Sequence, residues 1–158
     1  IRKKLPARLL LIGDGPDRSQ CEQLARELGI HDDVKFLGKQ TELVPILSSA
    51  DLFLLPSQSE SFGLSALEAM ACEIPVISSS VGGLPELVVH GQTGFIAEMG
   101  DIDRMSRYAI DLLTNPSKHQ LFAKASRQKA MEFNSNKIIA QYEQYYEKIL
   151  YSSEVPAK

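Results

Sequence analysis

The chain has 158 residues, a length typical of a single domain. With 44% hydrophobic and 23% charged residues it is neither a disordered nor a fibrous chain. The formal net charge of −3 provides no overall basic field for binding nucleic acid. No apolar run approaches the ~20 residues of a membrane helix, and Cys21 and Cys72 form neither a disulfide framework nor a zinc pattern. We therefore expect a cytoplasmic domain with no metal and no cofactor.

Apolar strands and helical segments alternate along the chain. Residues 7–13 (ARLLLIG) indicate a strand buried on both faces, which ends in a Gly-Asp-Gly-Pro turn. Helical spacing of apolar residues predicts a helix from Asp17 to Leu28, with Gly29 as its stop. By the same criteria, further strands are predicted at 34–37, 51–56, 75–79 and 95–97, and further helices at 41–47, 63–72, 101–114, 116–133 and 137–150.

This alternation predicts an α/β fold with a doubly wound, mostly parallel sheet and closing C-terminal helices. Residues 1–150 would form the domain, and residues 151–158 a tail. A mononucleotide-binding half usually opens with a strand and a phosphate-binding turn, and none precedes residue 7. We therefore expect the sheet to lack its first strand, the chain to be a fragment of a larger protein, and the unpaired sheet groups to favour self-association.

Such sheets bind ligands outside the carboxyl ends of their strands, and the segment E-S-F-G-L-S-A-L-E follows one of them. The backbone amides of Phe62, Gly63 and Leu64 would lie at a helix N-terminus, which favours an anion. Glu68, one turn further along, could accept two hydrogen bonds from a ribose diol. The structural alternative is that residues 65–68 form a capping box.

Five other features have weaker signals. Residues 13–15 read G-x-G without the third glycine of a dinucleotide fingerprint, but still allow a ligand to approach the backbone closely. Residues 82–86 (GGLPE) could form a second backbone cradle for a ligand. The D-x-D at 101–103 matches a metal–diphosphate pattern, but it opens a helix and is better explained as a helix cap. His90 lies in a glycine-rich loop, where a structural role is expected over a catalytic one, and the catalytic alternative stays open. The last helix carries an apolar stripe that indicates either core or a surface for a further domain: Tyr142, Tyr145, Tyr146, Ile149 and Leu150.

Together these segments resemble the donor-binding half of a GT-B glycosyltransferase of family 4 (group 1). The matching motifs run in family order: G-D-G-P at 13–16, V-x-F-L-G at 34–38, A-D-L-F-L-L-P-S at 50–57, E-S-F-G-L-x-x-L-E-A-M-A at 60–71, P-V-I at 75–77, G-G-x-P-E at 82–86 and H-G-x-T-G-F at 90–95. The pair of glutamates separated by seven residues, Glu60 and Glu68, is the hallmark of this family.

The resemblance implies a role for each matching position. Glu60 would contact the sugar near the reacting carbon, as the catalytic residue, and Glu68 would bind the ribose hydroxyls. The other donor-binding positions would be the amides of Phe62, Gly63 and Leu64 at the diphosphate, Gly13 near the nucleotide, and Gly38 with Lys39 near the base.

The reaction implied is transfer of a sugar with retention and without a divalent metal. The donor would be UDP-N-acetylglucosamine and the acceptor a small molecule, L-malate. A lipid-linked or polysaccharide acceptor, or a non-catalytic nucleotide-binding module, stays open as an alternative.

Two departures from the family pattern have consequences. Glu73 stands where most members have glycine, which implies a strained or altered turn. The family's Arg and Lys that neutralise the diphosphate would lie upstream of this chain, with an N-terminal acceptor domain, and Arg2, Lys3 and Lys4 do not match them. We therefore expect the chain alone to bind donor weakly and not to turn over.

Overall fold

The fold was analysed in a computed structural model that describes residues 1–152. Its strands are β1 (Leu9–Ile12), β2 (Val34–Gly38), β3 (Phe53–Leu55), β4 (Val76–Ser79) and β5 (Gly94–Ala97). Its helices are α1 (Arg18–Glu27), the 3-10 turn η1 (His31–Asp33), α2 (Val44–Leu47), α3 (Leu64–Ala71), α4 (Leu84–Leu87), α5 (Ile102–Thr114), α6 (Pro116–Met131) and α7 (Ser135–Ser152). The alternation of strands and helices predicted from the sequence is confirmed.

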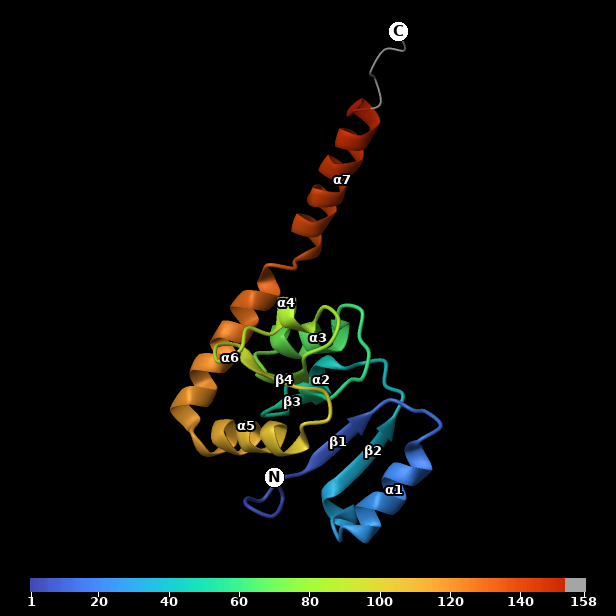
Figure 1. The fold of residues 1–158 in the computed structure, drawn as a ribbon, viewed down its shortest axis with the longest axis vertical. Coiled ribbons are helices and arrows are strands. Elements are labelled where there is room, and N and C mark those ends of the chain that lie inside the picture. Colours follow the sequence, from blue (N-terminus) through green and yellow to red (C-terminus); the bar gives the residue numbers. More distant parts are fainter. Residues whose placement is uncertain (153–158) are drawn as a thin grey trace.

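The strands form two sheets, and every pairing in them is parallel (Figure 1). β1 pairs with β2, with Leu9 opposite Val34, and the register shifts after Leu11 so that Ile12 lies opposite Gly38. The second sheet has the order β3-β4-β5. The parallel α/β class is therefore confirmed, but the strands of the described residues are divided between two sheets.

The hydrophobic core surrounds the three-stranded sheet. Val76 and Ile77 are adjacent on β4, are fully buried, and belong to separate clusters, as expected when successive side chains point to opposite faces. The first cluster joins the sheet to α2, α3, α4 and α6: Leu47, Ala66, Ala69, Met70, Ile74, Val76, Leu84, Leu87, Val88 and Ala130. The second joins it to α5 and α6: Ile77, Phe95, Ala97, Met105, Ala109, Leu112 and Phe122.

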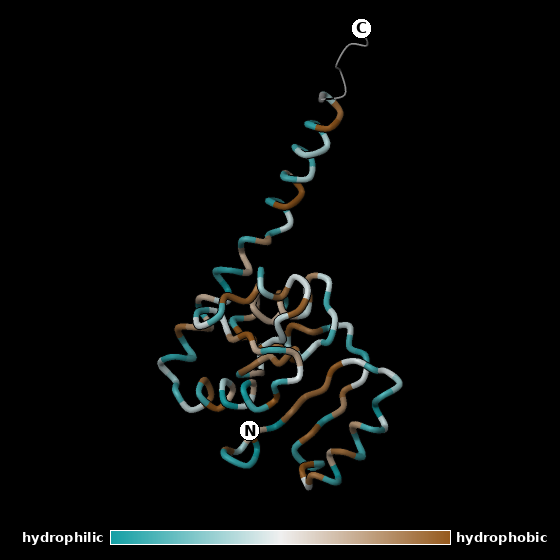
Figure 2. Tube along the Cα trace, in the orientation of Figure 1, coloured by the Kyte–Doolittle hydropathy of each residue, from teal (hydrophilic) through white to brown (hydrophobic). Residues whose placement is uncertain are grey.

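The prediction that the first strand is buried on both faces is wrong. Leu9, Leu10 and Ile12 of β1 are 39%, 37% and 37% exposed. β1 pairs only with β2, and its other edge borders an open groove, so part of each side chain remains accessible. Apolar residues thus follow the backbone of β1 and β2 at the rim of the molecule (Figure 2).

Several element boundaries differ from the prediction. α2 begins at Val44, three residues after the predicted start at Thr41. The turns η1 and α4 were not predicted, because segments this short carry no helical periodicity. α7 continues to Ser152, and the rest of the predicted tail, 153–158, lies outside the described residues.

The helix α7 projects away from the rest of the domain (Figure 1). Tyr142, Tyr145 and Tyr146 are 57–59% exposed, so the interpretation of the aromatic stripe as core is wrong. Among the described helices, none is both long and apolar enough to cross a membrane.

The backbone at Glu73 is left-handed, with φ 63°, the only positive φ among the described non-glycine residues. The strained turn predicted there is confirmed. The Glu73 carboxylate lies 3.7 Å from Arg127 Nε, and Arg127 also donates to the Ala71 carbonyl at 2.9 Å. Both charged side chains are more than half exposed, so this ion pair contributes little to stability.

We expect Glu73→Gly to raise the melting temperature by roughly 2 °C, since relief of a left-handed side chain gains ~1–2 kcal/mol and added chain entropy offsets part of it. Glu73→Ala is the control, because it removes the ion pair and keeps the strain. Thermal unfolding followed by circular dichroism measures both variants. A melting temperature of Glu73→Gly at or below that of Glu73→Ala would contradict the interpretation.

Candidate nucleotide-sugar site

The N-terminus of α3 presents free backbone amides. Gly63 is its N-cap residue, with φ 92° and ψ 47°, and no side chain caps the helix. Among the described hydrogen bonds none is donated by the amides of Phe62, Gly63 or Leu64. Since the helix begins at Leu64 and not after Ser65, the capping-box interpretation is wrong. The amides and the helix dipole form a positive pole suited to an anion.

The loop before α3 rests on the pair of glycines that follows β4. Gly83 N–H donates to the Ser61 carbonyl at 3.0 Å. A Cβ added to Gly82 would lie 1.6 Å from the Glu60 carbonyl oxygen, and one added to Gly83 would lie 2.8 Å from that of Ser61. The Gly83 amide therefore already has a hydrogen-bond acceptor within the protein. It is not free to bind a ligand, so the hypothesis of a second backbone cradle is wrong at Gly83. The two glycines instead allow two backbone segments to approach closely.

Both glutamates belong to this loop–helix unit. The half-buried Glu60 accepts a hydrogen bond at Oε1 from the Ser61 N–H, at 3.1 Å. Its Cγ lies 3.8 Å from the point where a Cβ on Gly63 would stand, so the side chain lies beside the start of α3. Glu68 is exposed on α3, one turn beyond Leu64. A carboxylate thus flanks the positive pole, and a second follows it along the helix.

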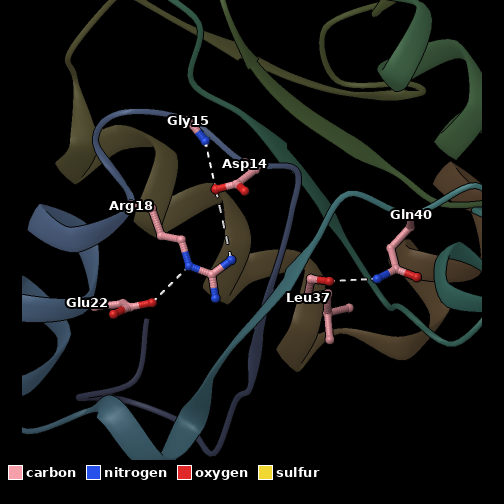
Figure 3. A network of polar contacts seen from close by, with 6 residues as sticks. All are labelled: Asp14, Gly15, Arg18, Glu22, Leu37 and Gln40. Atoms are coloured by element: carbon pink, nitrogen blue, oxygen red, sulfur yellow. Dashed lines mark hydrogen bonds and ion pairs between the residues drawn. The ribbon is translucent and has the colours of Figure 1, made fainter.

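The ends of β1 and β2 meet at two of the predicted positions. Gly13 N–H donates to the Gly38 carbonyl at 2.8 Å, and both glycines have positive φ, at 119° and 66°. Gln40 Nε2 donates to the Leu37 carbonyl at 2.6 Å and fixes the turn that carries the exposed Lys39 (Figure 3). The structure therefore brings Gly13, Gly38 and Lys39 together at the carboxyl ends of β1 and β2.

The sequence analysis missed Arg18 as a candidate functional residue. Its guanidinium lies 5.7 Å from the centre of the Phe36 ring, and its Nη1 would be 3.8 Å from a Cβ on Gly38. Arg18 Nε donates to Glu22 at 2.9 Å, and Nη1 lies 4.0 Å from Asp14 (Figure 3). The spacing of four residues between Asp14, Arg18 and Glu22 was the available signal. The structure thus adds a cation beside the Gly13–Gly38 pair.

Two other motifs have structural roles. Asp101 accepts a hydrogen bond from the Arg104 N–H at 2.9 Å and caps α5, so the interpretation of D-x-D as a helix cap is confirmed. Nδ1 of His90 accepts from the Ile96 N–H at 3.1 Å, and its ring packs against Phe95 and Tyr108. Within residues 1–152, no three His, Cys, Asp or Glu side chains gather as a metal site would require.

The sequence profile of the family described as "Glycosyl transferases group 1" matches residues 1–129. The chain belongs to this family. It is 45% identical, over 93% of its own length, to N-acetyl-alpha-D-glucosaminyl L-malate synthase of Bacillus anthracis. It is 40% identical, over 83% of its length, to D-inositol 3-phosphate glycosyltransferase of Mycolicibacterium smegmatis. The chain spans only 39% and 32% of the lengths of these two relatives.

Solved structures of GT-B glycosyltransferases share the fold. Sucrose-phosphate synthase from Thermosynechococcus elongatus superposes with a TM-score of 0.86 and 31% identity, over 96% of this chain and 41% of that one. HepE of Anabaena in complex with UDP has the same TM-score and 26% identity, over 92% and 42% of the two chains. The similarity to GT-B glycosyltransferases thus extends over nearly all of the chain.

Proposed function

We propose that this chain is the donor-binding half of a retaining glycosyltransferase that takes N-acetylglucosamine from UDP-N-acetylglucosamine. The observation that carries the proposal is the free positive pole at Phe62, Gly63 and Leu64, with Glu60 beside it and Glu68 one turn beyond. A nucleoside diphosphate sugar needs an anion site, an acceptor for ribose hydroxyls and a polar group at the sugar. The complex of HepE with UDP, 26% identical to this chain, supports a uridine nucleotide as the ligand.

In the proposed complex each residue has one task. The three amides hold the diphosphate, Glu68 accepts hydrogen bonds from the ribose, and Glu60 from the sugar hydroxyls near the reacting carbon. Gly13, Gly38 and Lys39 lie toward the base. The bond between the anomeric carbon and the diphosphate oxygen breaks, and the acceptor oxygen bonds to that carbon from the same face. The acceptor proton passes to the departing diphosphate, so Glu60 forms no covalent bond.

We propose L-malate as the acceptor, supported by the 45% identity to an N-acetyl-alpha-D-glucosaminyl L-malate synthase. The acceptor would be held by polypeptide outside these 158 residues, as the greater length of the relatives suggests. Because another relative is named for D-inositol 3-phosphate, transfer assays of the longer protein need both acceptors.

Glu68→Ala is expected to weaken UDP binding at least tenfold, because a charge-assisted hydrogen bond contributes ~1.5–3 kcal/mol. Calorimetric titration of UDP into the chain measures this. Glu143→Ala, which removes an exposed glutamate on α7, is the control and should bind UDP normally. Equal UDP affinity of Glu68→Ala and the control would remove Glu68 from the donor site.

Glu60→Gln separates an enzyme from a non-catalytic binding module. In the longer protein we expect kcat for sugar transfer to fall by roughly 100-fold or more, since a carboxylate acting at developing charge is worth several kcal/mol. The affinity for UDP, which lacks the sugar, should change less than threefold. If transfer continued at the normal rate, Glu60 would have no catalytic role.

A further inference from the structure

The side chain of Arg18 extends from the first turn of α1 to the carboxyl end of β2. Its Nη1 would lie 3.8 Å from a Cβ on Gly38, the last residue of β2. Gly38 in turn accepts a hydrogen bond from Gly13, the residue that follows β1. Ligands of parallel sheets bind outside the carboxyl ends of the strands. The guanidinium therefore lies where a ligand of this sheet would be bound.

Three neighbours hold this guanidinium in one orientation. Nε donates to the Glu22 carboxylate at 2.9 Å, and Nη1 lies 4.0 Å from the Asp14 carboxylate (Figure 3). The guanidinium carbon lies 5.7 Å from the centre of the Phe36 ring, within the range of a cation–π contact. Because the planar group is already held in place, a ligand that accepts a hydrogen bond from it immobilises little further side-chain freedom.

The two carboxylates determine which kind of ligand group Arg18 suits. With Asp14 and Glu22 beside the one guanidinium, the cluster has no net positive charge, and the exposed Lys39 on the nearby turn only balances the sum. A phosphate therefore finds little attraction here. The guanidinium nevertheless has N–H groups to donate, since Nε is the only Arg18 nitrogen with a hydrogen bond within the described residues. Arg18 thus suits a neutral acceptor, such as a carbonyl oxygen.

The next step rests on the nucleotide proposed above as the ligand. In that complex Glu68 of α3 holds the ribose, while Gly13 and Gly38 lie toward the base. The helix α3 follows β3 of one sheet, whereas Arg18 lies beside the other sheet. The base must therefore extend from the ribose toward Arg18, with the edge remote from the ribose leading. In a pyrimidine that edge carries the group on C4, a carbonyl acceptor in uracil and an amino donor in cytosine.

We propose that Arg18 is a specificity residue for the base, and that one of its Nη hydrogens is donated to the O4 carbonyl of uracil. The same N–H would face the amino group of cytosine, donor against donor, and would oppose its binding. The chain therefore selects a uridine nucleotide over a cytidine nucleotide through Arg18. This role concerns recognition of the base, and Arg18 takes no part in breaking the bond to the sugar.

The test compares UDP with CDP in NMR titrations of the isotope-labelled chain. We expect UDP to bind at least fivefold more tightly than CDP, and the Arg18 Nε–H signal to shift with UDP. Arg18→Met keeps an unbranched side chain to cover Phe36 but has no N–H, so its UDP affinity should fall to that for CDP. Arg26→Met, at an exposed position of the same helix, is the control and should keep the preference for UDP. Circular dichroism verifies that both variants fold.

Three results would overturn the proposal: equal affinity of the unchanged chain for UDP and CDP, an Arg18 Nε–H signal that UDP leaves unmoved, or equal losses of UDP and CDP affinity in Arg18→Met. Equal losses are what a phosphate contact or a merely structural ion pair would give. Glu68→Ala separates this inference from the proposed function. If Glu68→Ala loses UDP affinity while Arg18→Met keeps the preference for UDP, only the role of Arg18 fails. If neither nucleotide binds the unchanged chain, both proposals fail.

Discussion

Gly82→Ala is expected to lower UDP affinity at least tenfold. The added Cβ would stand 1.6 Å from the Glu60 carbonyl oxygen, and backbone on both sides leaves no flexible side chain to move away. The loop from Glu60 to Gly63 must therefore shift, and the amides at the start of α3 lose their alignment with the diphosphate. Calorimetric titration of UDP, with circular dichroism to verify folding, measures the effect.

Gly91→Ala is the matched control for this variant. Gly91 also has a positive φ, 79°, but its Cβ would meet no atom within 4 Å. Both variants therefore introduce left-handed strain of ~1–2 kcal/mol, and only Gly82→Ala adds the collision. If the two variants bound UDP equally well, contact with the glycine pair would not determine the position of the Glu60 loop.

Gly94→Ala is expected to destabilise the domain by about 3 kcal/mol or more, with a fall of the melting temperature by roughly 6 °C or more. Gly94 is buried at the start of β5, and a Cβ there would lie 1.8 Å from the Val76 carbonyl oxygen. The only way to admit it is to separate β4 from β5 at the centre of the core. Thermal unfolding followed by circular dichroism measures the change.

Gly15→Ala provides the comparison for Gly94→Ala. No positive φ is found at Gly15, and its Cβ would meet nothing within 4 Å, so the free energy of unfolding should change by less than ~0.5 kcal/mol. A melting temperature of Gly94→Ala close to that of Gly15→Ala would show that the strands can part at little cost.

The parallel α/β class could be predicted because its signals are local. Short strand segments such as the one predicted at 75–79 and helical periodicity such as that at 101–114 lie close to the observed β4 and α5. The start of α3 was also accessible to sequence reasoning, since a glycine between a polar loop and an apolar helix marks a terminus. Where the residues of an element determine its packing, the sequence therefore predicts the bounds of that element to within a few residues.

Features that depend on distant partners could not be predicted. The exposure of Leu9 and Leu10 depends on what lies beside β1, which an apolar run does not encode. The role of Gly82 depends on a carbonyl 22 positions earlier in the chain. The side chain of Arg18, on α1, lies beside Phe36 and Gly38 of β2. In each case the deciding contact joins segments that the sequence separates.

The division of the strands into two sheets also divides the candidate site. Gly13 and Gly38 lie at the end of one sheet, while the amides before α3 follow a strand of the other. No strand pairing among the described residues crosses from one sheet to the other, so no backbone hydrogen bonds between strands fix their relative position. A ligand that touches both halves must restrain their relative motion, and this loss of entropy opposes binding. Bound nucleotide would then link the two halves of the site. Any contact that restrains their relative motion before binding would lower this entropic cost and raise the affinity for nucleotide.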